Sequence, residues 1–324
     1  MPNRTPPPNR GRLQQMIDTA LPGGRVVSAR RLRGGLDARV HAVRVALRDG
    51  TRTSVVLRRK APDSRHSTAA QTETEHRTLT LLREAGVPSP RPLLLDAEGC
   101  YFDSPAMLMS YDGRPIVAPR NVSLWLSGLA DALLTLRAVT PDRFDLTVLD
   151  SAGATAVRER IERPLPAAIA ADPLAQAVPV ALKRRFPAID WSGACLVHRD
   201  FWPGNTVWRR GRFGAIIDWS TAAVGDPRID LAQCRVDLAM MHGPEMAEAF
   251  LDAHRARTST LVHDLWFFDL LIGLDDALAT YPSWLPGYHD LGLTQVREEI
   301  AGERLRTFLA LALRRSQGDD TLPD

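Results

Sequence analysis

The chain has 324 residues, 44% of them hydrophobic and 24% charged, with a formal net charge of +3. This composition is typical of a globular protein, the length indicates two lobes or domains, and no apolar run reaches the ~20 residues that a membrane-spanning helix needs. The basic residues are spread along the chain rather than clustered, which gives nucleic-acid binding little support.

The start of the chain and the cysteines indicate the compartment. The segment MPNRTPPPNRGR has no apolar core, so it is not predicted to be a secretory signal. We expect residues 1–12 to form a disordered tail. Cys100, Cys195 and Cys234 are scattered without the spacing of a metal site. That pattern is typical of a reducing environment and predicts a cytoplasmic protein.

Strand-like segments dominate the first third of the chain. Five segments rich in β-branched or apolar residues predict strands: VVSARRL, HAVRVAL, TSVVLRR, LLLD and SPAMLMSY. Asp49-Gly50 predicts a hairpin turn between the second and third of them. A helix is predicted over residues 69–85, ended by Gly86. We therefore expect a small lobe over residues 13–109, built on a five-stranded antiparallel sheet.

Helical patterns dominate from Val122 onward. One β segment interrupts them, TVWRRGRFGAIIDW, with its turn at Gly211. We expect residues 110–324 to form a larger, mostly helical lobe, joined to the first by a connector near Met109 to Arg114. The predicted fold class is therefore α+β with two lobes, and two joined lobes leave a cleft for a ligand.

The stretch LVHRDFWPGNTVW, residues 196–208, places an imidazole, a carboxylate and a carboxamide in a loop between two apolar runs. Ionised Asp200 can accept a proton from a substrate hydroxyl. Asn205 offers a neutral carbonyl oxygen, which is a suitable ligand for Mg²⁺. Asp218 ends the apolar run GAII, where a carboxylate is well placed to hold a metal. A base and two oxygen ligands for Mg²⁺ are what phosphoryl transfer from a nucleotide requires.

The same residues carry a family resemblance. HRDFWPGN followed by IIDWSTAAVGDPRIDLA resembles the aminoglycoside phosphotransferase and choline kinase family, within the wider protein-kinase-like fold. Eight positions match the spacings of that family: His198, Asp200, Asn205, Asp218, Gly225, Asp226, Pro227 and Asp230. The resemblance extends less strictly over residues 25–290. It implies a bilobal protein-kinase-like fold, with ATP or GTP as co-substrate and Mg²⁺ as cofactor.

The resemblance also implies roles for these residues. Asp200 would position or deprotonate the acceptor hydroxyl, while Asn205 and Asp218 would bind Mg²⁺. His198 would buttress the loop. Taken alone, these residue types are equally typical of turns and buried structural positions. We interpret two further acids as structural support, with Asp226 starting a Pro-containing turn and Asp230 holding the catalytic loop.

The nucleotide phosphates require a cation, held by an acid on a neighbouring helix. The segment SVVLRRK places Arg58 and Lys60 on one face of a strand. The resemblance aligns VLR so that Arg58 occupies the family's lysine position, and Lys60 is the alternative. A planar guanidinium and a point-like ammonium are not interchangeable. Glu75 matches the family position of the acidic partner, with Glu73 as the alternative.

Two further segments resemble parts of a nucleotide site. RRLRGGLDARVHAV resembles the loop that covers the phosphates, where Gly34 and Gly35 would permit close backbone approach, although the full G-x-G-x-x-G pattern is absent. SPAMLMSYDGRP resembles the adenine-side connector, whose backbone groups near Met109 and Tyr111 would bind the base. An apolar core strand that ends in an Asp-Gly turn accounts for this second segment equally well.

The acceptor is predicted to be a small molecule. Only STAAV separates Asp218-Trp219 from Gly225, which leaves no room for the activation segment with which protein kinases dock a peptide.

Residues 237–290 hold nine acidic residues against two arginines, a local formal charge of −7. In the predicted helix of LWFFDLLIGLDDALATY, Asp269 and Asp276 lie on one helical stripe, and Asp275 lies beside an apolar face. All three acids are candidates for acceptor binding, and Asp275 is favoured because an acid beside an apolar face needs a partner. Ordinary solvated helix faces explain most of the acids equally well.

The sequence therefore predicts a kinase that transfers the terminal phosphoryl group of a nucleoside triphosphate to a small-molecule hydroxyl. The acidic segment favours an aminoglycoside-like acceptor. A macrolide, another hydroxylated metabolite or an amino alcohol remain alternatives. A second class is a catalytically inactive, nucleotide-binding regulatory protein, which the arginine at position 58 leaves open.

Overall fold

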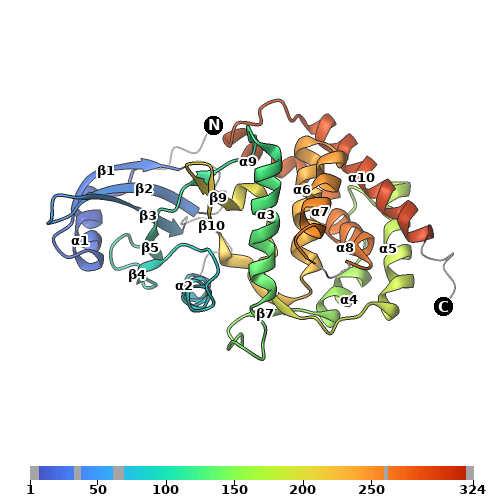
Figure 1. Cartoon of the computed structure of the whole chain (residues 1–324), viewed down its shortest axis with the longest axis horizontal. Helices are drawn as coiled ribbons and strands as arrows, with labels where there is room; N and C mark the ends of the chain where they lie inside the picture. The colour runs from blue at the N-terminus through green and yellow to red at the C-terminus, as the bar shows by residue number, and fades with distance from the viewer. Residues whose placement is uncertain (1–6, 33–37, 61–68, 259–261, 319–324) are drawn as a thin grey trace. The chain divides into compact units, whose positions relative to one another are not determined.

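The structure is a computed structural model that describes residues 7–32, 38–60, 69–258 and 262–318 (Figure 1). The chain divides into two compact units. A sheet unit comprises residues 1–114 with 207–220, and a helical unit comprises residues 115–206 with 221–324. Residues 207–220 thus belong to the sheet unit, although they lie far along the chain.

The sheet unit is built on five antiparallel strands in the order β1-β2-β3-β5-β4. Its elements are α1 (Arg10–Ala20), β1 (Arg25–Arg31), β2 (Ala38–Ala46), β3 (Arg52–Lys60), α2 (Ala69–Glu84), β4 (Pro92–Asp96) and β5 (Ala106–Ser110). The predicted five-stranded antiparallel sheet is confirmed.

The turn between β2 and β3 has the predicted chemistry. Gly50 adopts φ +81°, a conformation that glycine reaches without a steric penalty. The Asp49 carboxylate accepts hydrogen bonds from the Thr51 N–H and hydroxyl, at 2.9 and 2.6 Å. These contacts fix the register in which β2 pairs with β3.

The alternation along β3 assigns the two faces of the sheet. Val55 and Leu57 point into a core that α1 covers with Leu13, Met16 and Ile17. The next residue, Arg58, points to the opposite face, where it meets α2. One face of the sheet is therefore an apolar core, and the other face carries a buried charge.

A small second sheet completes this unit. Its strand order is β10-β9-β6, with β6 at Arg114–Pro115, β9 at Thr206–Arg209 and β10 at Arg212–Ile216. The turn between β9 and β10 lies at Gly211, as predicted, with φ +76°. Gly113 has φ +144°, and a Cβ added to it would lie 2.4 Å from the Trp208 carbonyl oxygen. Only glycine therefore permits this close crossing of the connector over β9.

The helical unit contains most of the helices and three short strands. Its helices are α3 (Val122–Arg137), α4 (Ala154–Glu162), α5 (Pro173–Arg185), α6 (Arg228–His242), α7 (Pro244–Arg255), α8 (Leu265–Ile272), a π-helix (Gly273–Leu278), α9 (Leu285–Asp290) and α10 (Glu298–Gly318). The strands are β7 (Asp150–Ala152), β8 (Cys195–Val197) and β11 (Ala223–Gly225), in the order β7-β11-β8. None of the helices in the described part of the chain is long and apolar enough to cross a membrane.

Helix α6 lies at the centre of this unit. Every residue from Ile229 to Met241 is buried, because α7, α8 and α10 all pack against α6 (Figure 1). Its polar residues therefore need partners inside the protein. Arg235, which is 0% exposed, shows how that demand is met.

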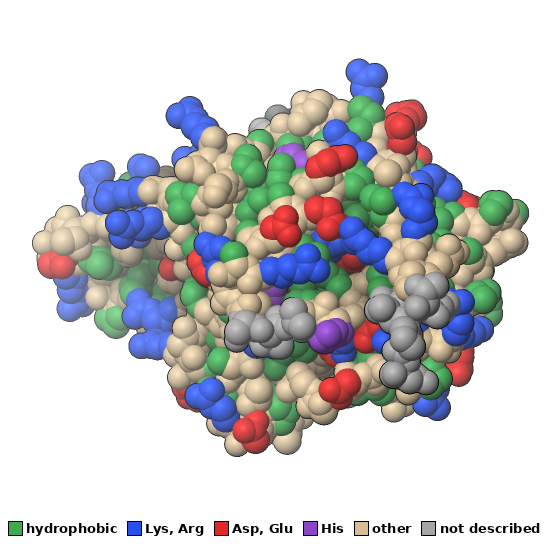
Figure 2. All heavy atoms as spheres, turned by 45° about the vertical axis from the view of Figure 1, so that its right-hand side comes forward, with side chains coloured by type: hydrophobic (Ala, Val, Ile, Leu, Met, Phe, Trp, Pro, Cys, Tyr) green, Lys and Arg blue, Asp and Glu red, His purple; other side chains and the backbone are tan. Residues whose placement is uncertain are grey.

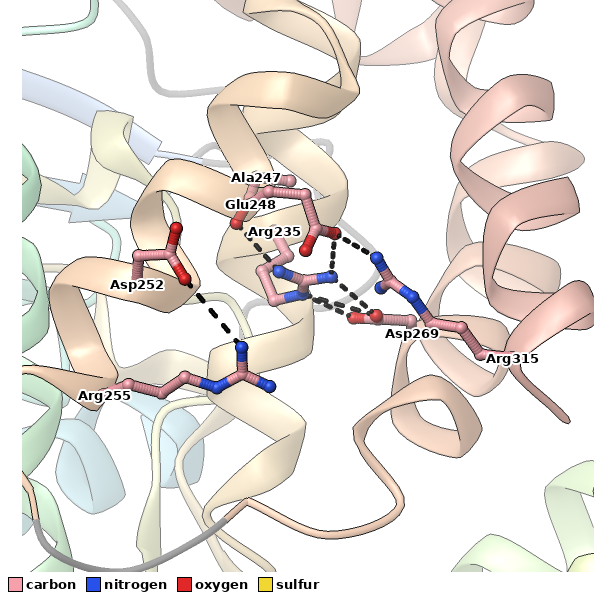
Figure 3. A network of polar contacts seen from close by, with 7 residues as sticks. All are labelled: Arg235, Ala247, Glu248, Asp252, Arg255, Asp269 and Arg315. Atoms are coloured by element: carbon pink, nitrogen blue, oxygen red, sulfur yellow. Dashed lines mark hydrogen bonds and ion pairs between the residues drawn. The ribbon is translucent and has the colours of Figure 1, made fainter. Parts of the chain in front are cut away.

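The guanidinium of Arg235 binds two neighbouring helices, α7 and α8 (Figure 3). It donates to both carboxylate oxygens of Asp269 in α8 at 3.0 and 3.3 Å, and to Glu248 in α7 at 2.9 Å. A further hydrogen bond of 2.8 Å reaches the Ala247 carbonyl oxygen. Arg315 of α10 also contacts Glu248, at 3.0 Å. Burial would lower the pKa of Arg235, but the Asp269 carboxylate raises it above the usual value.

We predict that Asp269→Asn lowers the free energy of unfolding by about 3 kcal/mol, because it removes one partner of a buried ion pair. The matched control is Arg255→Gln. Arg255 contacts Asp252 at 3.8 Å, and their side chains are 57% and 77% exposed, so the change should be below about 1 kcal/mol. Denaturant titration measures both. Equal small losses for the two variants would contradict the assigned importance of the buried pair.

Candidate active site

The catalytic loop begins where β8 ends. The Asp230 carboxylate, on the first turn of α6, accepts the backbone N–H groups of His198 and Arg199 at 2.6 and 2.7 Å. Arg199 adopts φ +65°, which is unfavourable for a residue with a side chain. Burial raises the pKa of Asp230 to about 6, although the two N–H groups stabilise its charged form. Asp230 therefore holds a strained loop in place, the supporting position predicted for it.

The loop gathers His198, Asp200 and Asn205. The Asn205 amide nitrogen donates to the Asp200 carboxylate at 2.7 Å and to its carbonyl oxygen at 2.9 Å. The ring of His198 is fully buried, and its Nδ1 accepts the Asp200 N–H at 3.2 Å. Because both groups point at Asp200, its carboxylate is fixed in orientation. The side-chain oxygen of Asn205 accepts no hydrogen bond from a described residue, which suits it to a cation.

An aromatic pair that the sequence analysis missed lies against this loop. The rings of Trp202 and Tyr288 are 5.5 Å apart. A Cβ added to Gly204 would lie 2.1 Å from the Trp202 ring, so glycine is required for this packing. The buried Tyr288 hydroxyl donates to Asp237 at 2.5 Å, and Gln233 donates to the other carboxylate oxygen of Asp237 at 2.8 Å. Trp202 lies within the stretch HRDFWPGN, but no sequence pattern around Tyr288 indicated that it would pack against this loop.

Asp226 lies at the start of α6, as predicted for a turn. Its carbonyl oxygen accepts the Ile229 N–H at 3.0 Å. Its carboxylate accepts a two-point contact from Arg228, with Nε at 2.8 Å and Nη2 at 2.6 Å. These contacts stabilise the start of α6.

The sheet unit contributes a second cluster, centred on Arg58. Its guanidinium forms ion pairs with Glu75 of α2 and, at 2.7 Å, with Asp218 just after β10. Glu75 is 2% exposed, whereas the side chain of Asp218 is 39% exposed. Burial would lower the pKa of Arg58, but the carboxylates of Asp218 and Glu75 raise it above its usual value. Asp218 has φ +64°, and strained backbone of this kind is frequent at functional sites.

The remaining nucleotide candidates are only partly described. Lys60 is the last residue of β3, and its side chain lies outside the described residues. Gly34 and Gly35 also lie outside them. Glu73 is half-buried, and the ion pair of Arg58 is with Glu75 instead.

The predicted adenine-side connector coincides with the end of β5. Met109 lies within β5, paired with Val56 of β3 on one side and Pro92 of β4 on the other. Tyr111 is the first residue beyond the strand. Its backbone is therefore outside the central sheet, which is the position expected of a group that binds a base.

The structure corrects the assignment of Asp269 as an acceptor-binding residue. The side chain is fully buried and bound to Arg235, so it stabilises helix packing. The expected helical stripe through Asp269 and Asp276 is also wrong, because α8 gives way to a π-helix over Gly273–Leu278, which changes the periodicity. The backbones of Asp275 and Asp276 lie in this π-helix, and their side chains are outside the described residues.

The acids of the 237–290 segment are largely paired. Glu248 binds Arg235 and Arg315, Asp264 binds Arg185, and Asp237 binds Tyr288. On the face shown in Figure 2, acidic side chains accordingly lie next to basic ones over the helical unit. The local charge of −7 is therefore not a bare acidic surface.

The residues present fit a hard divalent cation. Asn205 supplies a neutral oxygen and Asp218 a partly exposed carboxylate. Oxygen ligands of this type suit Mg²⁺, which keeps several waters and takes further oxygens from phosphates. The described residues contain no cluster of three or more His, Cys, Asp or Glu side chains that would form an all-protein metal site.

We predict that Tyr288→Phe lowers the free energy of unfolding by about 1–3 kcal/mol, because the buried Asp237 carboxylate loses a hydrogen-bond donor. Tyr281→Phe is the control. The Tyr281 hydroxyl makes no hydrogen bond to a described residue, so its loss should change stability by less than about 0.5 kcal/mol. Chemical denaturation of both variants provides the comparison. If Tyr281→Phe costs as much as Tyr288→Phe, the hydroxyl–carboxylate contact is not what stabilises this region.

Comparison with solved structures identifies the fold. A putative aminoglycoside phosphotransferase from Ralstonia eutropha superposes with a TM-score of 0.65 at 15% identity, over 96% of this chain and 98% of that one. A thermostable mutant of aminoglycoside phosphotransferase APH(4)-Ia gives 0.64 at 18% identity, over 96% and 100%. Macrolide 2'-phosphotransferase MphH from Brachybacterium faecium gives 0.58 at 21% identity, over 90% and 97%. These likenesses confirm the predicted α+β, protein-kinase-like fold.

Sequence comparison identifies the family. None of the curated proteins matches the chain significantly. The sequence model of the phosphotransferase enzyme family matches residues 28–263, which include the whole catalytic loop and the Arg58 cluster. The resemblance carried by HRDFWPGN is thereby confirmed, as is the prediction of a small-molecule phosphotransferase, and the chain belongs to the phosphotransferase enzyme family.

Proposed function

We propose that this protein transfers the terminal phosphoryl group of a nucleoside triphosphate to a hydroxyl of a small molecule. The observation that carries the proposal is the orientation of Asp200. The Asp230 carboxylate accepts two backbone N–H groups of the loop that contains Asp200, and the Asn205 amide donates to the Asp200 carboxylate. A chain that needed only a turn here would not require a buried acid to hold Arg199 at φ +65°.

Asp200 acts on the acceptor hydroxyl. The acceptor oxygen forms a bond to the terminal phosphorus, the bond to the leaving nucleoside diphosphate breaks, and the hydroxyl proton passes to the Asp200 carboxylate. Phosphoryl transfer depends mainly on positioning and on stabilising charge. A carboxylate fixed by Asn205 and by the loop backbone supplies the positioning.

The nucleotide is held by Arg58, with Asn205 and Asp218 as Mg²⁺ ligands. When bound, Mg²⁺ offsets the charge that develops on the transferred phosphoryl group. The ion pair with Glu75 directs the Arg58 guanidinium to one face of β3. Solved relatives support a nucleotide co-substrate, since APH(4)-Ia variants crystallise in ternary complexes with ADP or AMP-PNP and hygromycin B.

The acceptor is proposed to be an aminoglycoside-like molecule, in the cytoplasm. β11 begins at Ala223, only five residues after Asp218, so the structure contains no long segment there to dock a peptide. The aminoglycoside and macrolide phosphotransferases among the structural neighbours support an antibiotic-sized acceptor. The macrolide class, other hydroxylated metabolites and amino alcohols are the alternatives that a substrate screen must include.

One observation favours a second candidate, a nucleotide-binding protein without catalysis. The Nη2 of Arg58 donates a hydrogen bond of 2.7 Å to the Oδ1 of Asp218, the proposed metal ligand. If Mg²⁺ did not displace this contact, the nucleotide would bind without turnover.

We predict that Asp200→Asn lowers phosphoryl transfer by about 10²–10⁴-fold, the range typical of a lost general base. Nucleotide affinity should stay close to that of the wild type, because Arg58 and Asp218 provide that contact. A transfer screen over aminoglycosides, macrolides and amino alcohols, with ATP and GTP in turn, defines the reaction in which the variant is measured. Asp290→Asn, which changes an exposed acid on α9, is the control.

The outcomes separate the candidates. Unchanged turnover in Asp200→Asn would reject this residue as catalytic. Mg²⁺-dependent nucleotide binding with no transfer to any acceptor of the screen would favour the inactive protein.

We also predict that Arg58→Ala weakens nucleotide binding more than Lys60→Ala does. Arg58 is 9% exposed and bound to two carboxylates, so its loss also leaves Glu75 buried without its cation. Arg58→Lys keeps the charge but loses the two-point fork, and should lie between the wild type and the alanine variant. Calorimetric titration with ATP and Mg²⁺ measures all three. If Lys60→Ala weakens nucleotide binding more than Arg58→Ala does, Lys60 rather than Arg58 contacts the phosphates.

A further inference from the structure

The helical unit contains a cavity of about 710 Å³ that is separate from the catalytic loop residues. It is lined by the end of α3, the segment before β8, the start of α6 and the end of α7. Its size is that of a pocket for a small organic ligand. Asp200, Trp202 and Tyr288 are not among its lining residues, so it is not the acceptor site.

Most charged groups of the lining are already engaged. Arg228 binds both oxygens of Asp226 and donates to the carbonyl oxygens of Asp190 and His263, at 2.8 and 3.1 Å. Asp230 accepts its two N–H groups from the catalytic loop.

The three outer acids of the lining have partners as well. Asp264 accepts from Arg185 at 2.8 Å, and Asp190 accepts the Ser192 N–H at 2.9 Å. Asp142 has a hydrogen bond with the Thr140 side chain. Each of these carboxylates is therefore bound to at least one group of the protein.

Arg137 is the exception among the charged groups. It lies in the last turn of α3 and is half-buried. Within the described part of the chain it has neither an ion pair nor a hydrogen bond. A guanidinium presents five N–H donors in a planar fork, so it offers a carboxylate or phosphate a two-point contact.

His254, on the last turn of α7, supplies a second unsatisfied group. The residue is 3% exposed, and its Nδ1 has no hydrogen-bond partner among the described residues. Burial, and then the nearby charges of Arg137 and Arg255, lower the pKa of His254 to about 4. The ring is therefore neutral at pH 7, and a buried neutral nitrogen left unpaired is costly. His254 is one of the lining residues, so a ligand atom that reached this nitrogen would remove that cost.

We propose that this cavity binds a small organic anion with an apolar body. Arg137 anchors the carboxylate or phosphate group, His254 bonds a second polar atom, and the leucines of the lining (Leu133, Leu136 and Leu231) contact the apolar part. Asp230 lies in the same lining, so the ligand contacts the side chain that holds the catalytic loop. The site is thus placed to regulate the loop without competing for the acceptor.

The test uses the full chain and two probes of one shape, 1-naphthaleneacetate and its neutral amide. Calorimetry should show saturable binding at one site, with the acid about tenfold or more tighter than the amide, as a charge-assisted contact requires. Arg137→Gln should abolish that preference. Arg120→Gln is the matched control: Arg120 is exposed, precedes the other end of α3 and is absent from the lining, so it should keep the preference.

A second variant covers the case in which Arg137→Gln fails to fold. A Cβ added to Gly193 of the lining has no atom within 4 Å, so Gly193→Phe should fold and block the binding of both probes. The proposal is overturned if the acid and the amide bind equally, if the preference survives in Arg137→Gln, or if neither probe saturates. Tighter binding of 1-naphthalenemethylamine than of the acid would overturn it as well, since the acids of the lining would then dominate.

Discussion

A helix that is buried along almost its whole length, and still carries polar side chains, constrains everything packed around it. In α6 these side chains are Asp230, Gln233, Arg235 and Asp237. Each would cost several kcal/mol if it were buried without a partner, so the surrounding elements must supply one. Arg235 takes its partners from α7 and α8, and Asp237 takes the Tyr288 hydroxyl. Asp230 takes two N–H groups of the catalytic loop. The same requirement that assembles the helices therefore also shapes the loop that presents Asp200.

The arginine at position 58 follows from a comparable constraint in the sheet unit. A lysine ammonium is a compact point charge, whereas a guanidinium can bind two carboxylates with separate N–H groups. Arg58 uses this geometry, with Nη1 on Glu75 and Nη2 on Asp218. The departure from the family's lysine is therefore accommodated by the fold. For the proposed function this contact has a consequence: Mg²⁺ would compete with Arg58 for the Asp218 carboxylate, and the nucleotide phosphates would compete with Asp218 for the Arg58 guanidinium.

The parts of this structure that sequence predicted are those with local signals. β-branched and apolar segments identified the five strands, and Asp49-Gly50 identified the hairpin. The pairing of Arg58 with Glu75 came instead from the family resemblance. The contacts that sequence missed join distant segments. Asp237 and Tyr288 are 51 residues apart, and Arg235 and Asp269 are 34 apart. No periodicity marks such pairs, because the partner is set by how the helices pack. The π-helix after α8 was missed for a related reason, since the stripe through Asp269 assumed an uninterrupted α-helical period.

A charge count along the chain is therefore a weak guide to what a protein binds. The segment 237–290 has a formal charge of −7 in sequence, yet three of its acids, Glu248, Asp264 and Asp269, are bound by arginines from outside the segment. These are Arg185, Arg235 and Arg315. A ligand is attracted by polar groups that the fold leaves unpaired, and these are visible only once every internal partner has been assigned. By that criterion the cavity in the helical unit offers hydrogen-bond donors to a ligand, although its lining is rich in aspartates. Each of its acids has at least one hydrogen bond within the protein, whereas the guanidinium of Arg137 and the Nδ1 of His254 have no hydrogen-bond partner in the described part of the chain.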